Sequence, residues 1–81
     1  MKARTAQQIG NHIRNARKKR GWSQAQLGEK AGMKQATVSV IETGSPKARL
    51  DTILAALAAL DLEFLIQDRT KSSISDIEDI F

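Results

Sequence analysis

Apolar side chains recur every three or four residues along the first sixty positions, which is the period of an amphipathic α-helix. The first such stripe predicts a helix over residues 5–20, with Thr5 as its N-cap and Gly21 as its stop. Three further segments with this period are predicted as helices over residues 24–31, 34–44 and 50–60. The pattern therefore predicts an all-α fold, a bundle of four to five helices.

The second predicted helix has the clearest local signals in the chain. Ser23 and Gln26 have the spacing of a capping box, while Trp22 and Leu27 occupy the two positions of a hydrophobic staple. Gly32 follows this helix and suits a left-handed C-cap. The third predicted helix buries Val38 and Ile41, and the apolar residues that mark the fourth are Leu50, Ile53, Leu54, Leu57 and Leu60.

The hydrophobic period changes after the fourth helix. Leu62, Phe64 and Ile66 recur at every second position, which is the repeat of a β-strand, although a continuation of the fourth helix is the alternative. A single strand in a helical chain leaves its backbone hydrogen-bonding groups unpaired. We therefore expect these three residues to mediate dimerisation, in a two-stranded sheet formed with the same strand of a second copy.

The 81 residues allow one domain with a C-terminal extension. We divide them into a helical domain at 1–61, a dimerisation strand at 62–68 and a flexible acidic tail at 69–81. The tail is either a solvated segment or one that binds a partner. A domain of this size has a small core, and the chain has no cysteine for disulfides, so association into a homodimer is the expected compensation.

Charge is distributed unevenly along the chain. Residues 1–49 hold eleven Lys and Arg against two acidic residues, a balance of +9, whereas residues 50–81 have a balance of −5. A basic front half indicates a polyanionic partner such as a nucleic acid. No segment has the roughly 20 apolar residues of a membrane span, so we expect no membrane partner and a cytoplasmic, nucleoid-associated location.

Candidate catalytic chemistry is sparse in this sequence. His12 is the only histidine, no cysteine is present, and no glycine-rich phosphate-binding loop is found. A metal site and an activated nucleophile both need more such groups than this. We therefore expect no enzyme activity, no metal, no cofactor and no small-molecule substrate.

The second and third helices, joined by a short turn at Gly32, have the pattern of a helix-turn-helix, in which the second helix enters the major groove of DNA. Small and polar side chains on its first turn suit base edges. Gln35 can bond adenine bidentately, Lys34 can donate to guanine, and a thymine methyl can contact a small side chain. The predicted base contacts are Lys34, Gln35, Ala36 and Thr37.

Contacts with DNA phosphates come from cationic and polar side chains around the recognition helix. Glu42 is repelled by phosphates, and we interpret it as the structural partner of a nearby arginine. The predicted phosphate contacts are Gln24, Ser39, Arg14, Arg17, Lys18 and Lys47. A helical module that binds RNA or a membrane surface through its charge is an alternative, which predicts weak sequence preference.

The chain resembles the Cro/C1-type (XRE) helix-turn-helix family over residues 8–60. The motif positions that carry this resemblance are Ser23, Gln24, Leu27, Gly32, Val38, Ser39, Ile41, Glu42 and Gly44. Within the family, "GWSQAQLGEKAGMKQATVS" and the later "DLEFLIQD" resemble the HipB-type antitoxins of HipBA toxin–antitoxin systems. The resemblance implies a lambda-repressor-like fold, a homodimer on a palindromic operator, repression of its own operon, and binding of a HipA-like serine/threonine kinase toxin.

Three features depart from the family pattern or leave the function open. Lys34 stands where most members have a capping Ser or Thr, although HipB-type proteins also have lysine there. Gly28 replaces the usual alanine, which makes the helix less favourable by about 1 kcal/mol. The acidic ending is not a family motif. A stand-alone phage-like repressor without a toxin partner is the alternative function.

Overall fold

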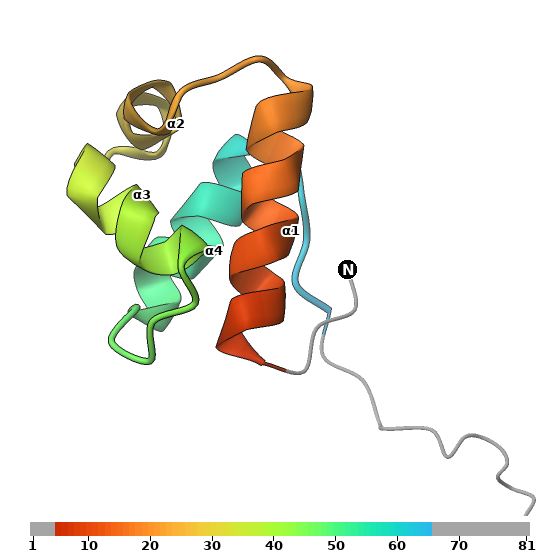
Figure 1. Ribbon diagram of the computed structural model, residues 1–81. Coiled ribbons are helices and arrows are strands. Elements are labelled where there is room, and N and C mark those ends of the chain that lie inside the picture. The colour runs from red at the N-terminus through yellow and green to blue at the C-terminus, as the bar shows by residue number, and fades with distance from the viewer. Residues whose placement is uncertain (1–4, 66–81) are drawn as a thin grey trace, which may run out of the picture.

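Four α-helices make up the part of the chain that the computed structural model describes, residues 5–65 (Figure 1). Their bounds are α1 (Ala6–Lys19), α2 (Gln24–Ala31), α3 (Gln35–Glu42) and α4 (Leu50–Ala59). The predicted all-α helix-turn-helix fold is thus confirmed. The predicted acidic tail and residues 66–68 of the predicted strand lie outside the described residues.

The helix ends follow the local signals in the sequence. The Thr5 hydroxyl accepts from the Gln8 amide at 3.1 Å and caps α1. At α2, the Gln26 amide donates to the Ser23 hydroxyl at 3.0 Å, and the Ser23 amide donates to the Gln26 side chain at 2.7 Å. Gly32 ends α2 with φ at 74°, the left-handed conformation that favours glycine. The predicted caps and the bounds of α2 are confirmed.

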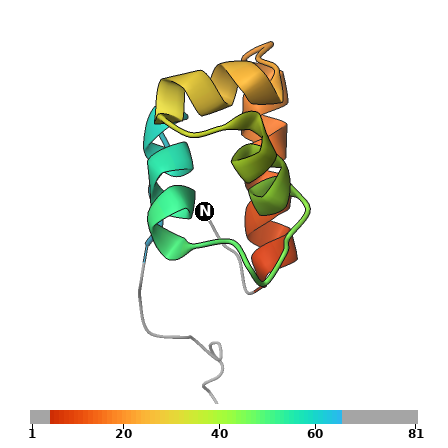
Figure 2. The ribbon, with the colours of Figure 1, turned by 90° about the vertical axis from the view of Figure 1, so that its left-hand side faces the viewer.

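The core lies where all four helices meet, and α2 crosses one end of the bundle (Figure 2). Leu50 and Leu54, which belong to the apolar stripe that marks the fourth helix, do not join it: they are 62% and 44% exposed. Because α4 is apolar around most of its circumference, Ala56 and Leu57 can fill its inner side and leave these two leucines outside. The buried apolar residues are Ile13, Leu27, Val38, Ile41, Ala56, Leu57 and Leu60.

Two glycines allow backbones to approach closely inside the bundle. A Cβ atom on Gly10 would lie 2.5 Å from the Ile41 carbonyl oxygen and 2.8 Å from that of Glu42, both at the end of α3. On Gly28, a Cβ atom would lie 2.6 Å from the carbonyl oxygen of Met33. Gly28 therefore lowers the helix propensity of α2, but it leaves the space that the tight turn between α2 and α3 needs.

Replacing Gly10 by alanine is expected to lower the free energy of unfolding by about 1–2 kcal/mol. Overpacking against backbone costs about 1–3 kcal/mol, and the gain in helix propensity of up to about 1 kcal/mol offsets only part of it. Asn11→Ala, at the next and exposed position of α1, is the matched control. If urea denaturation finds Gly10→Ala as stable as that control, the close approach of α1 and α3 is not a constraint.

The segment after α4 turns back onto the bundle. Leu62 and Phe64 are half-buried and pack against the core, while Leu65 is 60% exposed. The Arg20 guanidinium donates to the Leu60 carbonyl, which closes the end of α4. Among the described residues no strand is assigned. The ladder partner that we expect is a second chain, so the dimerisation strand stays a prediction, and Ile66 lies outside the described residues.

Candidate nucleic-acid interface

The turn between α2 and α3 sets the direction of α3. Gly32 reverses the chain, and the Met33 amide donates to the Gly28 carbonyl at 2.8 Å. Lys34 then adopts an extended conformation as the N-cap of α3, without a side-chain capping bond. A lysine ammonium only donates hydrogen bonds, so it cannot cap the helix, and the exposed Lys34 side chain can donate to an external acceptor.

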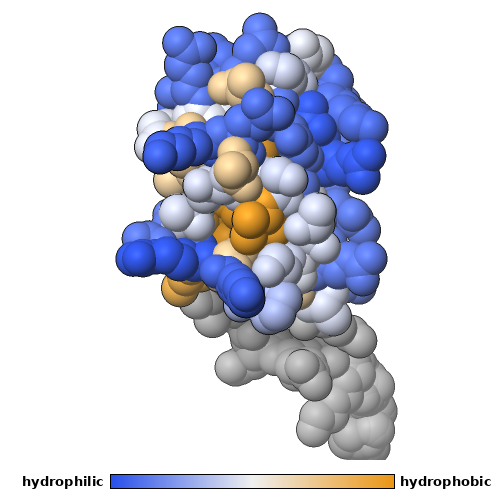
Figure 3. Space-filling view, turned by 60° about the vertical axis from the view of Figure 1, so that its left-hand side comes forward, coloured by the Kyte–Doolittle hydropathy of each residue, from blue (hydrophilic) through white to orange (hydrophobic). Residues whose placement is uncertain are grey.

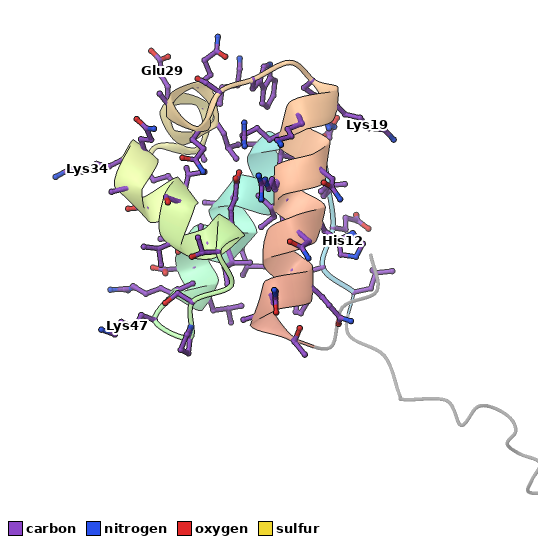
Figure 4. The ribbon with its side chains drawn as sticks, in the orientation of Figure 1. His12, Lys19, Glu29, Lys34 and Lys47 are labelled. Atoms are coloured by element: carbon purple, nitrogen blue, oxygen red, sulfur yellow. The ribbon has the colours of Figure 1, made fainter. Side chains whose placement is uncertain are left out.

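The four predicted base-contacting residues form the start of α3. Lys34, Gln35 and Ala36 are exposed and Thr37 is half-buried. Figure 4 shows Lys34 extending away from the bundle. The opposite side of α3 is anchored, because Val38 is fully buried. The first turn of α3 is therefore an exposed surface, on a helix packed into the core, that a partner can reach.

The predicted phosphate-contacting cations lie on two sides of α3. Lys47 is exposed in the loop after α3 and points to the same side of the molecule as Lys34 (Figure 4). Arg14 and Lys18 are exposed on α1, one turn apart, so they share one flank of that helix. Arg14 lies one turn after Gly10, where α1 meets the end of α3. These cations can flank a duplex that contacts α3.

The structure gives Arg17 a different role from the predicted phosphate contact. Its side chain is 10% exposed, and its Nε and Nη2 donate to the two carboxylate oxygens of Glu42 at 2.7 and 3.1 Å. Its Nη1 donates to the Trp22 carbonyl at 2.8 Å. Arg17 therefore holds α1, α3 and the start of α2 together, as a structural residue, and the predicted arginine partner for Glu42 is found.

Gln24, the first residue of α2, also reaches Glu42. Its side-chain nitrogen donates to Glu42 Oε1 at 3.1 Å, and the residue is half-buried. Ser39, the remaining predicted phosphate contact, is half-buried on α3. Gln24 thus lies at the boundary between the interior and the face that α3 presents.

Three further residues on this face were not predicted from the sequence. Val40 is 38% exposed, and Arg49 and Thr52 line a shallow hollow beside it. Figure 3 shows an apolar area there, surrounded by hydrophilic side chains. Arg49 could have been found from the sequence, because it lies in the basic loop "PKAR" that follows α3. The residues that line the hollow are Thr37, Val40, Ile41, Lys47, Ala48, Arg49 and Thr52.

Arg49 is not a fully available cation. Its Nε and Nη2 donate to the carboxylate of Asp51, each at 3.1 Å. The Arg49 guanidinium beside it holds the pKa of Asp51 below its usual value. Both side chains are mostly exposed, so solvent screens this pair, and a phosphate can compete for Arg49.

His12 lies away from this face. It is exposed on α1, and Figure 4 shows it with Lys19 on the side of the molecule opposite to Lys34. Within residues 5–65, no group of three or more His, Cys, Asp or Glu side chains is placed to hold a metal ion. None of the described helices is both long enough and apolar enough to span a membrane.

The amino-acid sequence is similar to those of known helix-turn-helix proteins. Residues 13–66 match the model of the helix-turn-helix family HTH_3. The antitoxin HipB of Escherichia coli strain K12 is 32% identical over 71 residues, covering 88% of this chain and 81% of that protein. The antitoxin HipB of Escherichia coli O6:H1 is 33% identical over 66 residues, covering 82% and 70%.

Solved structures agree with the sequence comparison. The matching chain of a HipA–HipB–O2–O3 complex superposes with a TM-score of 0.78 at 31% identity, covering 86% of this chain and 99% of that chain. The matching chain of a complex of HipB with an O4 20-mer gives the same TM-score, identity and coverage. The similarity therefore extends over nearly the whole of those chains.

Proposed function

Because the chain belongs to the helix-turn-helix family, and within it to the HipB antitoxins, we propose that it is a sequence-specific DNA-binding antitoxin. It represses its own toxin–antitoxin operon from a palindromic operator and binds a HipA-like serine/threonine kinase toxin. Its place of action is the nucleoid, and it needs no cofactor.

The observation that carries the DNA-binding role is the first turn of α3. Lys34, Gln35 and Ala36 are exposed together, while Val38 anchors the other side of the helix. A major groove admits a helix that presents such a turn, and it offers distinct acceptors to lysine and glutamine. The related HipB structure with an O4 20-mer supports the same role.

A homodimer would place two copies of α3 on one operator. Exposed apolar surface near the C-terminal segment supports this assembly: Ala58 and Leu65 line one shallow hollow, and Leu54 lies one turn before Ala58 on α4. Leu62 and Phe64 pack against the core of their own chain, whereas Leu65 is exposed. If the segments after α4 of two chains paired, Leu65 would therefore be the side chain available to contact the second chain. Two-fold symmetry fits a palindromic site.

The kinase partner follows from the antitoxin family and from the charge distribution. The related HipB occurs in a complex with HipA. In this chain, residues 50–81 have a balance of −5, so DNA repels this half and leaves it to a protein partner. Co-purification with a HipA-like kinase distinguishes the antitoxin from a stand-alone repressor, because only the antitoxin retains the kinase.

Selection from random duplexes at a fixed salt concentration tests the DNA-binding role. The proposal predicts a palindrome bound at least ~10³-fold more tightly than random duplex. Its half-sites should lie about one helical turn apart, or a multiple of one turn. Discrimination below about tenfold on every duplex would instead support binding of polyanions through charge alone.

Lys18→Ala is expected to weaken binding to every duplex by a similar factor. Because Lys18 is exposed and reads no base, its loss removes one phosphate contact and lowers the slope of log affinity against log salt by about 1. Lys19→Ala, the neighbouring cation on the side of α1 that carries His12, is the control (Figure 4). An equal effect of both substitutions on the salt slope would contradict the assignment of the Lys18 flank to DNA.

A further inference from the structure

Glu42 receives hydrogen bonds from two different helices. Arg17 on α1 donates to both of its carboxylate oxygens, and Gln24 on α2 donates to Oε1 at 3.1 Å. The Glu42 side chain is only 3% exposed, whereas Gln24 is half-buried. One buried carboxylate therefore connects the interior to a side chain at the surface.

The carboxylate fixes which way the Gln24 amide points. An ionised carboxylate only accepts hydrogen bonds, so the amide nitrogen of Gln24, and not its oxygen, must face Glu42. An amide nitrogen has two N–H groups. One donates to Glu42, and within residues 5–65 the structure gives no acceptor for the other.

Arg17 removes the electrostatic obstacle to such an acceptor. An unpaired carboxylate beside Gln24 would repel a phosphate. The bidentate contact with Arg17 balances that charge within the interior, and Arg17 is held in turn by the Trp22 carbonyl. The pair thus supplies a fixed acceptor without a net negative charge near the DNA backbone.

We propose that the Arg17–Glu42 pair is a positioning device for DNA binding, which sets the Gln24 amide so that its second N–H donates to a backbone phosphate. This inference rests on the proposed DNA-binding function. Arg17 and Glu42 are positioning residues and do not themselves contact DNA. Their effect on affinity acts through Gln24.

A double-mutant cycle measured on operator affinity tests the device. In the natural background, Gln24→Ala should weaken binding about tenfold, as expected for one lost charge-assisted hydrogen bond. In the background Arg17→Met with Glu42→Leu, the amide has lost its anchor, so Gln24→Ala should cost less than twofold. Circular dichroism of each variant establishes that it is folded. If the Arg17–Glu42 pair were purely structural, Gln24→Ala would reduce operator affinity by the same factor in both backgrounds.

Arg17→Leu combined with Glu42→Met provides a second background in case the first double variant does not fold. It also removes the acceptor of Gln24, so Gln24→Ala should again cost less than threefold. A tenfold cost of Gln24→Ala in the altered background would overturn the positioning role. Failure of the natural protein to prefer any palindrome would instead overturn the proposed function.

Discussion

Replacing Glu42 by alanine is expected to lower the free energy of unfolding by about 3–5 kcal/mol, the largest loss that we anticipate from one substitution. The change leaves the Arg17 guanidinium buried without its carboxylate, and an uncompensated buried charge has a cost of this size. Small domains have roughly 5 kcal/mol of stability in total. Urea denaturation at a fixed protein concentration should therefore find much of the variant unfolded without denaturant.

Two companion variants separate the buried pair from a general effect of charge. Asp51→Ala removes the carboxylate of an exposed ion pair and should change the urea midpoint little. Arg17→Met combined with Glu42→Leu removes both buried charges and should recover most of the stability, because apolar replacements of buried pairs are often neutral. If Glu42→Ala were as mild as Asp51→Ala, the buried ion pair would not hold the helices together.

Gln35→Ala is expected to reduce operator affinity by about 1–3 kcal/mol, or about 5- to 150-fold, and to relax the preference at one base position of each half-site. Gln35 is the first residue of α3 and is exposed, so its removal takes away a base contact without disturbing the core. Affinities for the operator and for single-position variants of it measure the effect.

Asn15→Ala is the control for this substitution. Asn15 is exposed on the flank of α1 that also carries His12 and Lys19, away from α3. Its removal should leave affinity and specificity unchanged. Equal losses on every duplex for Gln35→Ala would show that this residue supports binding without reading a base.

The elements that are set by short-range chemistry could be predicted from the sequence. The capping box at Ser23 and Gln26 and the C-cap at Gly32 involve residues within one or two turns of each other, and the structure has each of them. The exposure of Ala36 also follows from the helical period, since Val38 and Ile41 fix the opposite, buried side of α3. Local pattern thus predicts the helix-turn-helix and its exposed turn.

The role of Arg17 could not be predicted in the same way. In the sequence it begins the run "RKKR", where its charge is indistinguishable from that of Lys18. Its burial depends on Glu42, which is 25 positions away and meets it only when α1 packs on α3. The interpretation of Glu42 as an arginine partner was correct, yet it did not identify which arginine.

The outer side of α4 was also beyond prediction from the period. Leu50 and Leu54 fit the same apolar stripe as Leu57, and a helix with so many leucines and alanines has no polar side to mark the outside. Packing decided the matter, because α4 turns Ala56 and Leu57 toward the other helices. The two exposed leucines are consistent with the dimer that we propose.

In the function that we propose, the first turn of α3 enters the major groove at two symmetric half-sites. Dimethyl sulfate tests this directly, because it methylates guanine N7 in the major groove and adenine N3 in the minor groove. We expect bound protein to protect N7 positions in two patches about one helical turn apart, or a multiple of one turn, with protection beside Gln35 lost in Gln35→Ala. Protection confined to adenine N3, or unbroken along the duplex, would contradict the account.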